Sequence, residues 1–253
     1  NKVILNAYYG SEENNFSIIS GSTTADADPI PVSCGVSIEG DIGAKGAISL
    51  QFNPAGDKPS LIVSGDNSKI AKSAKNEILN NYSYLVDMKN IKKVITQLYR
   101  ESAKSNFPLN DVNKTNIAGV WKLNEGQSIN RENFTGVGTF IASKGGTIII
   151  NKAKVQDGGF LGIIAKDTNV EIRGDVKNVA IFAYDTSIVK NGDGKVTFNN
   201  PNSMSFEGSV VADGIIVKNS GGDSVIKWAP AIQNHIPPGF ADILSPIISE
   251  KAP

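Results

Sequence analysis

Few side chains in this sequence are arranged for catalysis. The single histidine, His235, lies in Gln-Asn-His-Ile-Pro-Pro near the C-terminus, and no Gly-x-Ser-x-Gly motif precedes it. Serine and cysteine nucleophiles need a positioned base, normally histidine, and histidine-rich metal sites need several such residues. The glycine pairs Gly158-Gly159 and Gly221-Gly222 lack the Lys-Ser/Thr of a phosphate-binding loop. The sequence therefore predicts no catalytic residue, no metal and no cofactor.

Two aspartates are the residues whose spacing could nevertheless bring two carboxylates together. Asp167 and Asp185 each lie two residues after an alanine of a recurring pattern, so they can be neighbours on successive turns of the chain. Two close carboxylates can bind Ca²⁺ or share a proton. The alternative, which we favour, is that each Asp-Thr begins a turn by hydrogen-bonding its own backbone.

A second chemistry is the binding of flat sugar surfaces. Aromatic rings stack on sugar faces while Asn, Gln and Asp side chains form hydrogen bonds, and this chain combines aromatic residues with abundant Asn. Tyr184 is the strongest candidate, because it aligns with Lys166, Ser143 and Asp213 in what we interpret as a polar, outward position. The candidate carbohydrate-binding residues are Tyr184, Trp228, Trp121, Tyr8 and Tyr9.

Charge and composition exclude several classes of partner. The 25 basic and 25 acidic residues give a formal charge of zero, which argues against a nucleic-acid partner. The single cysteine, Cys34, excludes an internal disulfide, and no apolar run approaches the length of a membrane span. The chain begins with Asn1 rather than Met, so we interpret it as a mature or trimmed fragment from which a signal peptide or anchor was removed.

The elements that must position these residues repeat along the chain. An apolar pair, an alanine, a polar turn and a β-branched strand recur around Ala142, Ala165, Ala183 and Ala212, at separations of 23, 18 and 29 residues (165−142, 183−165, 212−183). An earlier copy surrounds Ala44. Recurrence near 20 residues is typical of stacked coils that bury their apolar faces against one another. We therefore predict a mainly β protein, a right-handed parallel β-helix; an antiparallel sandwich is the competing architecture.

The middle of the chain has a different period. Apolar residues from Ile70 to Leu98 are three and four apart, which predicts a helical insertion over about 66–105 that covers the side or one end of the solenoid. A loop-rich segment, 106–135, follows. Within it Asn106–Asn116 and Asn124–Asn133 are predicted loops, and Val120 to Leu123 is a predicted strand. The whole chain, 1–253, is predicted to be one solenoid domain.

Three segments carry a family resemblance. Gly138–Ile148, Gly208–Val217 and the ending Ile236-Pro237-Pro238-Gly239-Phe240 resemble the C-terminal β-helical region of PilX-like type IV pilus-assembly proteins. The arrangement of solenoid, helical insertion and Asn-rich loops is also similar to the C-terminal domain of tapirins, cellulose-binding surface proteins of plant-degrading bacteria. The second resemblance implies a non-catalytic adhesin, but it transfers no binding motif residue by residue.

These observations together predict a non-enzymatic, extracellular protein of the cell surface that adheres to an insoluble plant polysaccharide, with cellulose as the first candidate. The protein itself is not expected to span a membrane. The alternative is a structural minor component of a type IV pilus, with protein partners. A polysaccharide lyase or hydrolase ranks third, because the clustered aspartates and the basic residues of those enzymes are missing from the sequence.

Overall fold

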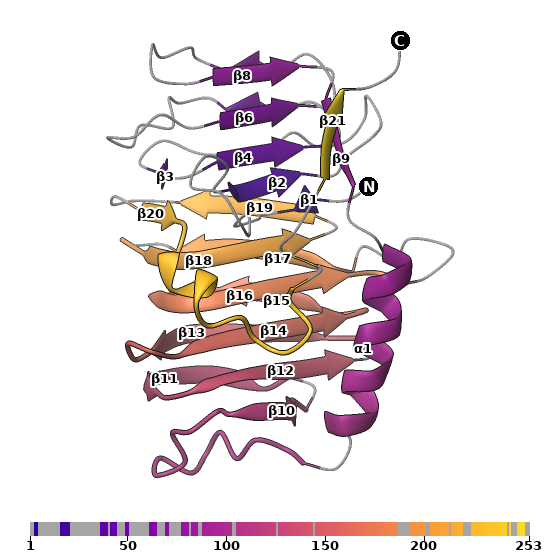
Figure 1. Cartoon of the computed structure of the whole chain (residues 1–253). Helices are drawn as coiled ribbons and strands as arrows, with labels where there is room; N and C mark the ends of the chain where they lie inside the picture. The colour runs from indigo at the N-terminus through magenta and orange to yellow at the C-terminus, as the bar shows by residue number, and fades with distance from the viewer. Residues whose placement is uncertain are drawn as a thin grey trace.

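The computed structural model of the chain is a stack of mostly parallel β-strands with one α-helix along its side, so the predicted parallel β-helix is confirmed (Figure 1). Backbone and side chains are described for residues 91–102, 105–124, 126–142, 145–186, 193–199, 203–212, 224–241 and 243. The other residues assigned to the helix or to strands are described by their backbone alone.

The strands form two rows that lie side by side along the stack. The covered row contains β10 (Gly119–Lys122), β12 (Val137–Ser143), β14 (Phe160–Lys166), β16 (Val176–Tyr184) and β18 (Ser205–Ala212). The open row contains β11 (Ser128–Phe134), β13 (Thr147–Val155), β15 (Asn169–Ile172), β17 (Lys195–Asn200) and β19 (Gly214–Asn219). Within each row every strand pairs in parallel with the next, which is the geometry of stacked coils.

The recurring alanines of the sequence pattern occupy paired positions in successive strands of the covered row. Ala142 pairs with Ala165, Ala165 with Ala183, and Ala183 with Ala212, although the intervening segments differ in length. The four alanines are between 0% and 4% exposed. The repeat in the sequence therefore marks one position in successive coils, and the differences in spacing are loops between the strands.

The spatial order of the coils differs from their order in the chain. β18 pairs in parallel with β2 (Phe16–Ser20), and the stack continues through β4 (Asp41–Ala44), β6 (Leu61–Ser64) and β8 (Glu77–Asn80). The indigo N-terminal strands therefore lie beyond the orange C-terminal ones in Figure 1. The chain starts in the middle of the stack, and α1 (Met88–Ser102) leads it to the opposite end.

Short strands complete the architecture. At the boundary between the two halves, β20 (Ser224–Lys227) pairs in parallel with β18 and with β3 (Val36–Glu39), and β1 (Val3–Ile4) pairs antiparallel with β18. Two further two-stranded pairings and one 3₁₀ helix are assigned: β5 (Ser49–Leu50) with β7 (Lys69–Ile70), β9 (Tyr82–Leu85) with β21 (Ile247–Glu250), and η1 (Pro230–Gln233).

The predicted helical insertion is shorter than expected. Helix α1 occupies only Met88–Ser102, and the first part of the predicted segment 66–105 contains β7, β8 and β9. In β8, Ile78 and Leu79 pair with Ile62 and Val63 of β6, so they extend the solenoid by another coil. Short strands separated by turns can reproduce the three- and four-residue spacing of a helix, which explains the error.

The predicted loop Asn124–Asn133 is also wrong in part, because Ser128–Phe134 forms β11. Its inward positions are Ile129, Arg131 and Phe134, and the arginine at the centre broke the apolar alternation that marks a strand in the sequence. The strand predicted at Val120 to Leu123 is confirmed over its first three residues by β10.

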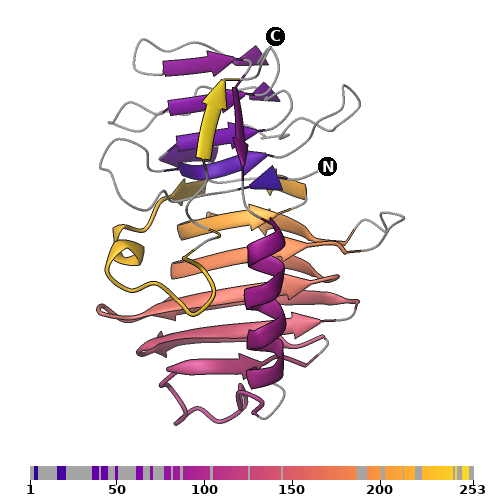
Figure 2. The ribbon, with the colours of Figure 1, turned by 45° about the vertical axis from the view of Figure 1, so that its right-hand side comes forward.

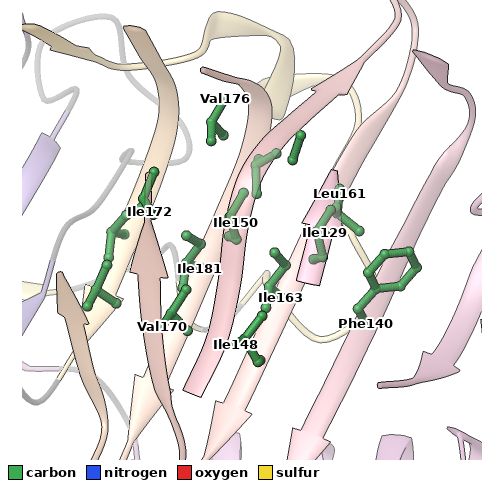
Figure 3. Packing of buried hydrophobic residues seen from close by; sticks show 14 of the residues in the cluster. Ile129, Phe140, Ile148, Ile150, Leu161, Ile163, Val170, Ile172, Val176 and Ile181 are labelled. Atoms are coloured by element: carbon green, nitrogen blue, oxygen red, sulfur yellow. The ribbon is translucent and has the colours of Figure 1, made fainter. Parts of the chain in front are cut away.

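The interior of the solenoid is filled by in-register columns of apolar side chains. One column consists of Phe140, Ile163, Ile181 and Val210, contributed by successive strands of the covered row. The open row adds columns such as Ile150, Ile172 and Phe198, and Figure 3 shows several of these side chains packed between the rows. Exposure of these residues is 0%, so each coil depends on its neighbours for burial.

A second apolar layer, which we call the outer apolar layer, lies on the outside of the covered row. The outward column Ile141, Ile164, Phe182 and Val211 packs against α1 and against the segment 229–243, which we call the strap. Figure 2 shows the ribbons of α1 and of the strap beside the strands. The strap is fastened by the hydroxyl of Thr139, which donates to the carbonyl oxygen of Pro238 at 2.7 Å.

Candidate functional site

The covered row is closed to any large ligand. Strands β14 and β18 are buried on both faces over most of their length, because the interior core lies on one side and α1 and the strap lie on the other. A sugar-binding or protein-binding surface on the described part of the solenoid must therefore be sought elsewhere.

Tyr184 points outward from its coil, as predicted, but it belongs to this closed layer, so the prediction that its position is polar and open to solvent is wrong. Its side chain is 3% exposed, and its ring stacks on Phe182 at a centroid distance of 4.8 Å. Burial raises the pKa of Tyr184, and the nearby Tyr99 and Asp167 add to the effect. The aligned Lys166 suggested an open position, but α1 covers the coil of Tyr184.

The two tryptophans are partly buried. The indole N–H of Trp121 donates to the carbonyl oxygens of Ile117 (3.1 Å) and Ala118 (3.2 Å), and the Lys114 ammonium lies 5.3 Å from its ring centroid. Trp228 packs against the outer apolar layer, and its buried indole N–H has no hydrogen-bond partner among the described residues. Tyr8 and Tyr9 lie outside the described residues. The described candidates do not form a common aromatic plane, because Tyr184 is buried and Trp121 is engaged on one ring face.

Asp167 links two coils instead of capping its own turn. Its carboxylate accepts hydrogen bonds from the backbone N–H (2.6 Å) and the hydroxyl (2.8 Å) of Thr186. Asp167 adopts a left-handed backbone conformation (φ 51°), and Asp185 is buried at 6% exposure. Within the described ranges, no group of three or more potential metal ligands occurs. The turn interpretation of Asp-Thr thus needs one correction, since the partner lies on the next coil.

The open row presents a regular polar surface. Residues of β13 and β15 alternate between buried and partly exposed, and both aromatic side chains in the described parts of β11 and β17, Phe134 and Phe198, point into the core. The outward side chains are mostly hydroxyl, amide or charged: Ser128, Asn130, Thr147, Ile149, Asn151, Asn169, Glu171, Arg173, Lys195, Thr197 and Asn199. We call this surface the open face.

Hydrogen bonds between coils hold the open face rigid. Arg173 binds Glu171 through two donors, at 3.0 and 2.8 Å, and Asn199 of the next coil donates to the same carboxylate at 2.6 Å. Asn169 accepts a hydrogen bond from the backbone N–H of Lys195 at 2.9 Å. These side chains are fixed in position, which lowers the entropy lost when a ligand orders them. The sequence signal for this face was the polar alternation within the β-branched strands, and a search centred on aromatic residues missed it.

A third surface carries inter-coil ion pairs. Lys154 aligns with Lys177, Lys177 with Glu207, and Glu207 with Lys227, on successive strands. The ammonium of Lys227 lies 3.0 Å from the Glu207 carboxylate, and that of Lys177 lies 2.9 Å from Asp157. Because Lys154, Lys177 and Lys227 each form an ion pair with a carboxylate, these lysines are largely neutralised within the molecule.

Asp175, on the same surface, makes stability depend on pH. Partial burial disfavours its charged form, but the backbone N–H of Ser205 (3.1 Å) and the Lys154 ammonium (3.2 Å) outweigh this effect and lower its pKa. A carboxyl with a lower pKa in the folded state stabilises the protein above its unfolded pKa, and this contribution is lost as the pH falls through the folded pKa.

We therefore expect Asp175→Asn to reduce the stability lost between about pH 7 and about pH 3. Urea unfolding of both proteins at the two pH values measures this difference. An acid-induced loss in the variant as large as that of the unsubstituted protein would contradict the assignment.

Comparison of the chain with protein-family models, with curated proteins and with solved structures finds no match. In the described part of the chain, no helix has the length and apolar character needed to cross a membrane.

Proposed function

We propose that this protein is a non-catalytic, extracellular adhesin of the cell surface that lays its open face against an insoluble plant polysaccharide, cellulose first among the candidates. The observation that supports this proposal is the outward grid of hydroxyl and amide side chains on strands that remain uncovered in the described structure. Hydroxyl and amide groups both donate and accept hydrogen bonds, as a surface of sugar hydroxyls requires.

The mode of binding is passive and distributed. Neighbouring coils repeat about every 4.8 Å, so equivalent side chains form straight columns that can meet a periodic ligand at several points. Each contact is weak because water competes for it, and the rigidity of the face together with many copies on one cell supplies the strength. In this arrangement the sugar contacts come from the polar columns, without a ring supplied by Tyr184.

The test is a pull-down of the purified chain with microcrystalline cellulose, with xylan and chitin run in parallel. Thr197→Arg places a long charged side chain in the column Ile149, Glu171 and Thr197, at the centre of the open face. We expect saturable binding by the unsubstituted chain and at least about a tenfold loss in this variant, equivalent to about 1.4 kcal/mol. The matched control is Thr96→Arg, the same substitution at an exposed residue of α1.

Equal losses in both arginine variants would remove the open face from the proposal. Absence of binding to all three polysaccharides would favour the second candidate, a structural component of a type IV pilus with protein partners. That candidate draws support from the segments resembling pilus-assembly proteins, which form parts of β12, β18 and the strap. Release of reducing sugars from any of the polysaccharides would instead indicate an enzyme.

A further inference from the structure

Helix α1 has two sharply different sides. Ile91, Ile95 and Leu98 are 1%, 2% and 7% exposed and pack on the covered row, whereas Lys92, Lys93 and Arg100 are exposed to solvent. Successive residues of an α-helix turn by about 100°, so these three cations fall within an arc of about 100° on the side opposite the isoleucines. Thr96 lies within the same arc.

These cations differ from most of those on the solenoid. Lys92, Lys93 and Arg100 make no ion pair with any described residue, and the carboxylate of Glu101 accepts a hydrogen bond from Gln97 at 3.1 Å. Within the described ranges, the lysines and arginines that pair with a carboxylate are Lys152, Lys154, Lys166, Lys177, Lys227 and Arg173. Among the described cations that form no ion pair, three therefore lie on α1, while Lys114, Lys122 and Lys195 lie outside it.

Lys122 adds a further cation near the helix, because it lies on β10, a strand that α1 packs against. In β10 it occupies the register position that Ile141 occupies in β12, and Ile141 packs in the outer apolar layer with α1. Lys122 itself is exposed. Its neighbour Val120, two residues earlier and therefore on the same side of the strand, also packs against that layer.

The result is a ridge of positive charge along the solenoid, formed by Lys92, Lys93, Arg100 and Lys122. From Lys92 to Arg100 the helix rises by about 12 Å, whereas an arc of about 100° on a helix about 10–12 Å across is about 8 Å wide, so the ridge is longer than it is wide. An extended strand with an anionic group on each unit can follow such a line. A membrane surface fits less well, because the apolar side of α1 is already packed against the solenoid and cannot insert.

We propose that this ridge binds an extended anionic polymer, a strand that carries a carboxylate or a phosphate on each repeating unit. The ridge is separate from the open face, so this inference goes beyond the proposed function and does not depend on it. Binding releases counterions from the polymer, which makes the affinity fall with salt in proportion to the number of cations engaged.

The probes are polygalacturonate, which carries carboxylates, and inorganic polyphosphate, with dextran as the neutral control. Binding of the full chain is followed by calorimetry between about 50 and 200 mM salt. With four contacts, we expect the logarithm of the affinity to fall with the logarithm of salt at a slope of about −3. Comparison of the two polymers distinguishes a carboxylate-bearing partner from a phosphate-bearing one.

Charge reversal at Lys92→Glu and Lys93→Glu together is expected to bring the slope to about −1.5 and to lower the affinity at least tenfold at the lowest salt. A second variant works in the opposite direction: Thr96→Arg adds a cation within the ridge and should tighten binding and steepen the slope. The control for position is Lys195→Glu, which reverses an exposed cation on the open face.

The inference is overturned if the unsubstituted chain binds dextran as well as the anionic polymers, or fails to bind either anionic polymer at low salt. It is also overturned if Lys195→Glu weakens binding as much as Lys93→Glu alone. Cellulose binding of the same variants separates the two proposals, because Thr197→Arg should affect only cellulose and the Lys92 and Lys93 reversals only the anionic polymers.

Discussion

Truncation of Phe240 to alanine is expected to lower the free energy of unfolding by about 3–5 kcal/mol. Phe240 is fully buried in the strap, and the backbone of Gly162 in β14 leaves the space that its ring occupies. A Cβ atom on Gly162 would lie 2.4 Å from one ring carbon of Phe240 and 2.8 Å from another. Because Gly162 has no side chain, the ring of Phe240 fits against its backbone. This contact fixes the strap on the outer apolar layer.

The same contact predicts the effect of the converse substitution. Gly162→Ala is expected to cost about 1–3 kcal/mol in the unsubstituted protein through overpacking. In the Phe240→Ala background the clash with the ring is absent, so the cost should be smaller. Urea unfolding of the two single variants and the double variant yields the coupling energy. Additive effects would show that the strap is held elsewhere, for example at Thr139.

Arg131→Met is expected to lower the free energy of unfolding by at least about 3 kcal/mol. Arg131 is 8% exposed and lies at an inward position of β11. Its guanidinium donates to the carbonyl oxygens of Leu109 and Asp111, each at 2.8 Å, and to that of Lys114. Methionine retains much of the volume but leaves these carbonyls without their donor.

The planar guanidinium group of Arg131 suggests a control variant for this prediction. Arg131→Lys retains the charge but replaces a planar group with five donors by a single ammonium, so it should restore only part of the stability. Thermal and urea unfolding measure both variants, and limited proteolysis of residues 105–118 reports whether the segment detaches. Equal stability of the Met and Lys variants would mean that the hydrogen bonds contribute little.

The segment held by Arg131 covers one end of the solenoid. The backbone N–H of Lys122 in β10 donates to the carbonyl of Ser105 at 2.9 Å, and the Phe107 N–H donates to the Lys122 carbonyl at 3.3 Å. Phe107 is buried against Trp121, Phe134 and Phe140. An uncovered strand edge tends to pair with another chain, so release of this segment should also promote self-association of the Arg131→Met variant.

The solenoid was predictable because the same residue type recurs at paired positions in successive strands. The alanines of the covered row fit one tight position in each coil, and their recurrence survives loops of different length. The boundaries of α1 were not predictable from apolar spacing alone, because Ile78 and Leu79 gain their burial from β6, which lies elsewhere in the sequence. The order of the coils is likewise a tertiary property, since no local signal indicates that Val210 pairs with Ile18.

The candidate site was harder to predict than the fold. Tyr184 and Lys166 occupy equivalent positions, yet Tyr184 is buried in the outer apolar layer, where it stacks on Phe182, and Lys166 is partly exposed. A sequence alignment of coils reveals which residues share a column but not which column another element covers. The polar alternation of β13 and β15 was visible, but residues such as Asn169 and Glu171 have no side-chain type that singles them out as a binding site.

The length of helix α1 is close to the height of the coils that it passes. Its 15 residues span about 22 Å, while the five strands from β10 to β18 span four intervals of about 4.8 Å, or about 19 Å. Since the helix carries the chain from the boundary near β2 to the far end of the stack, its length and the number of coils it passes must change together. A homologue with one additional coil below that boundary should carry about three more residues, close to one helical turn, in its helix.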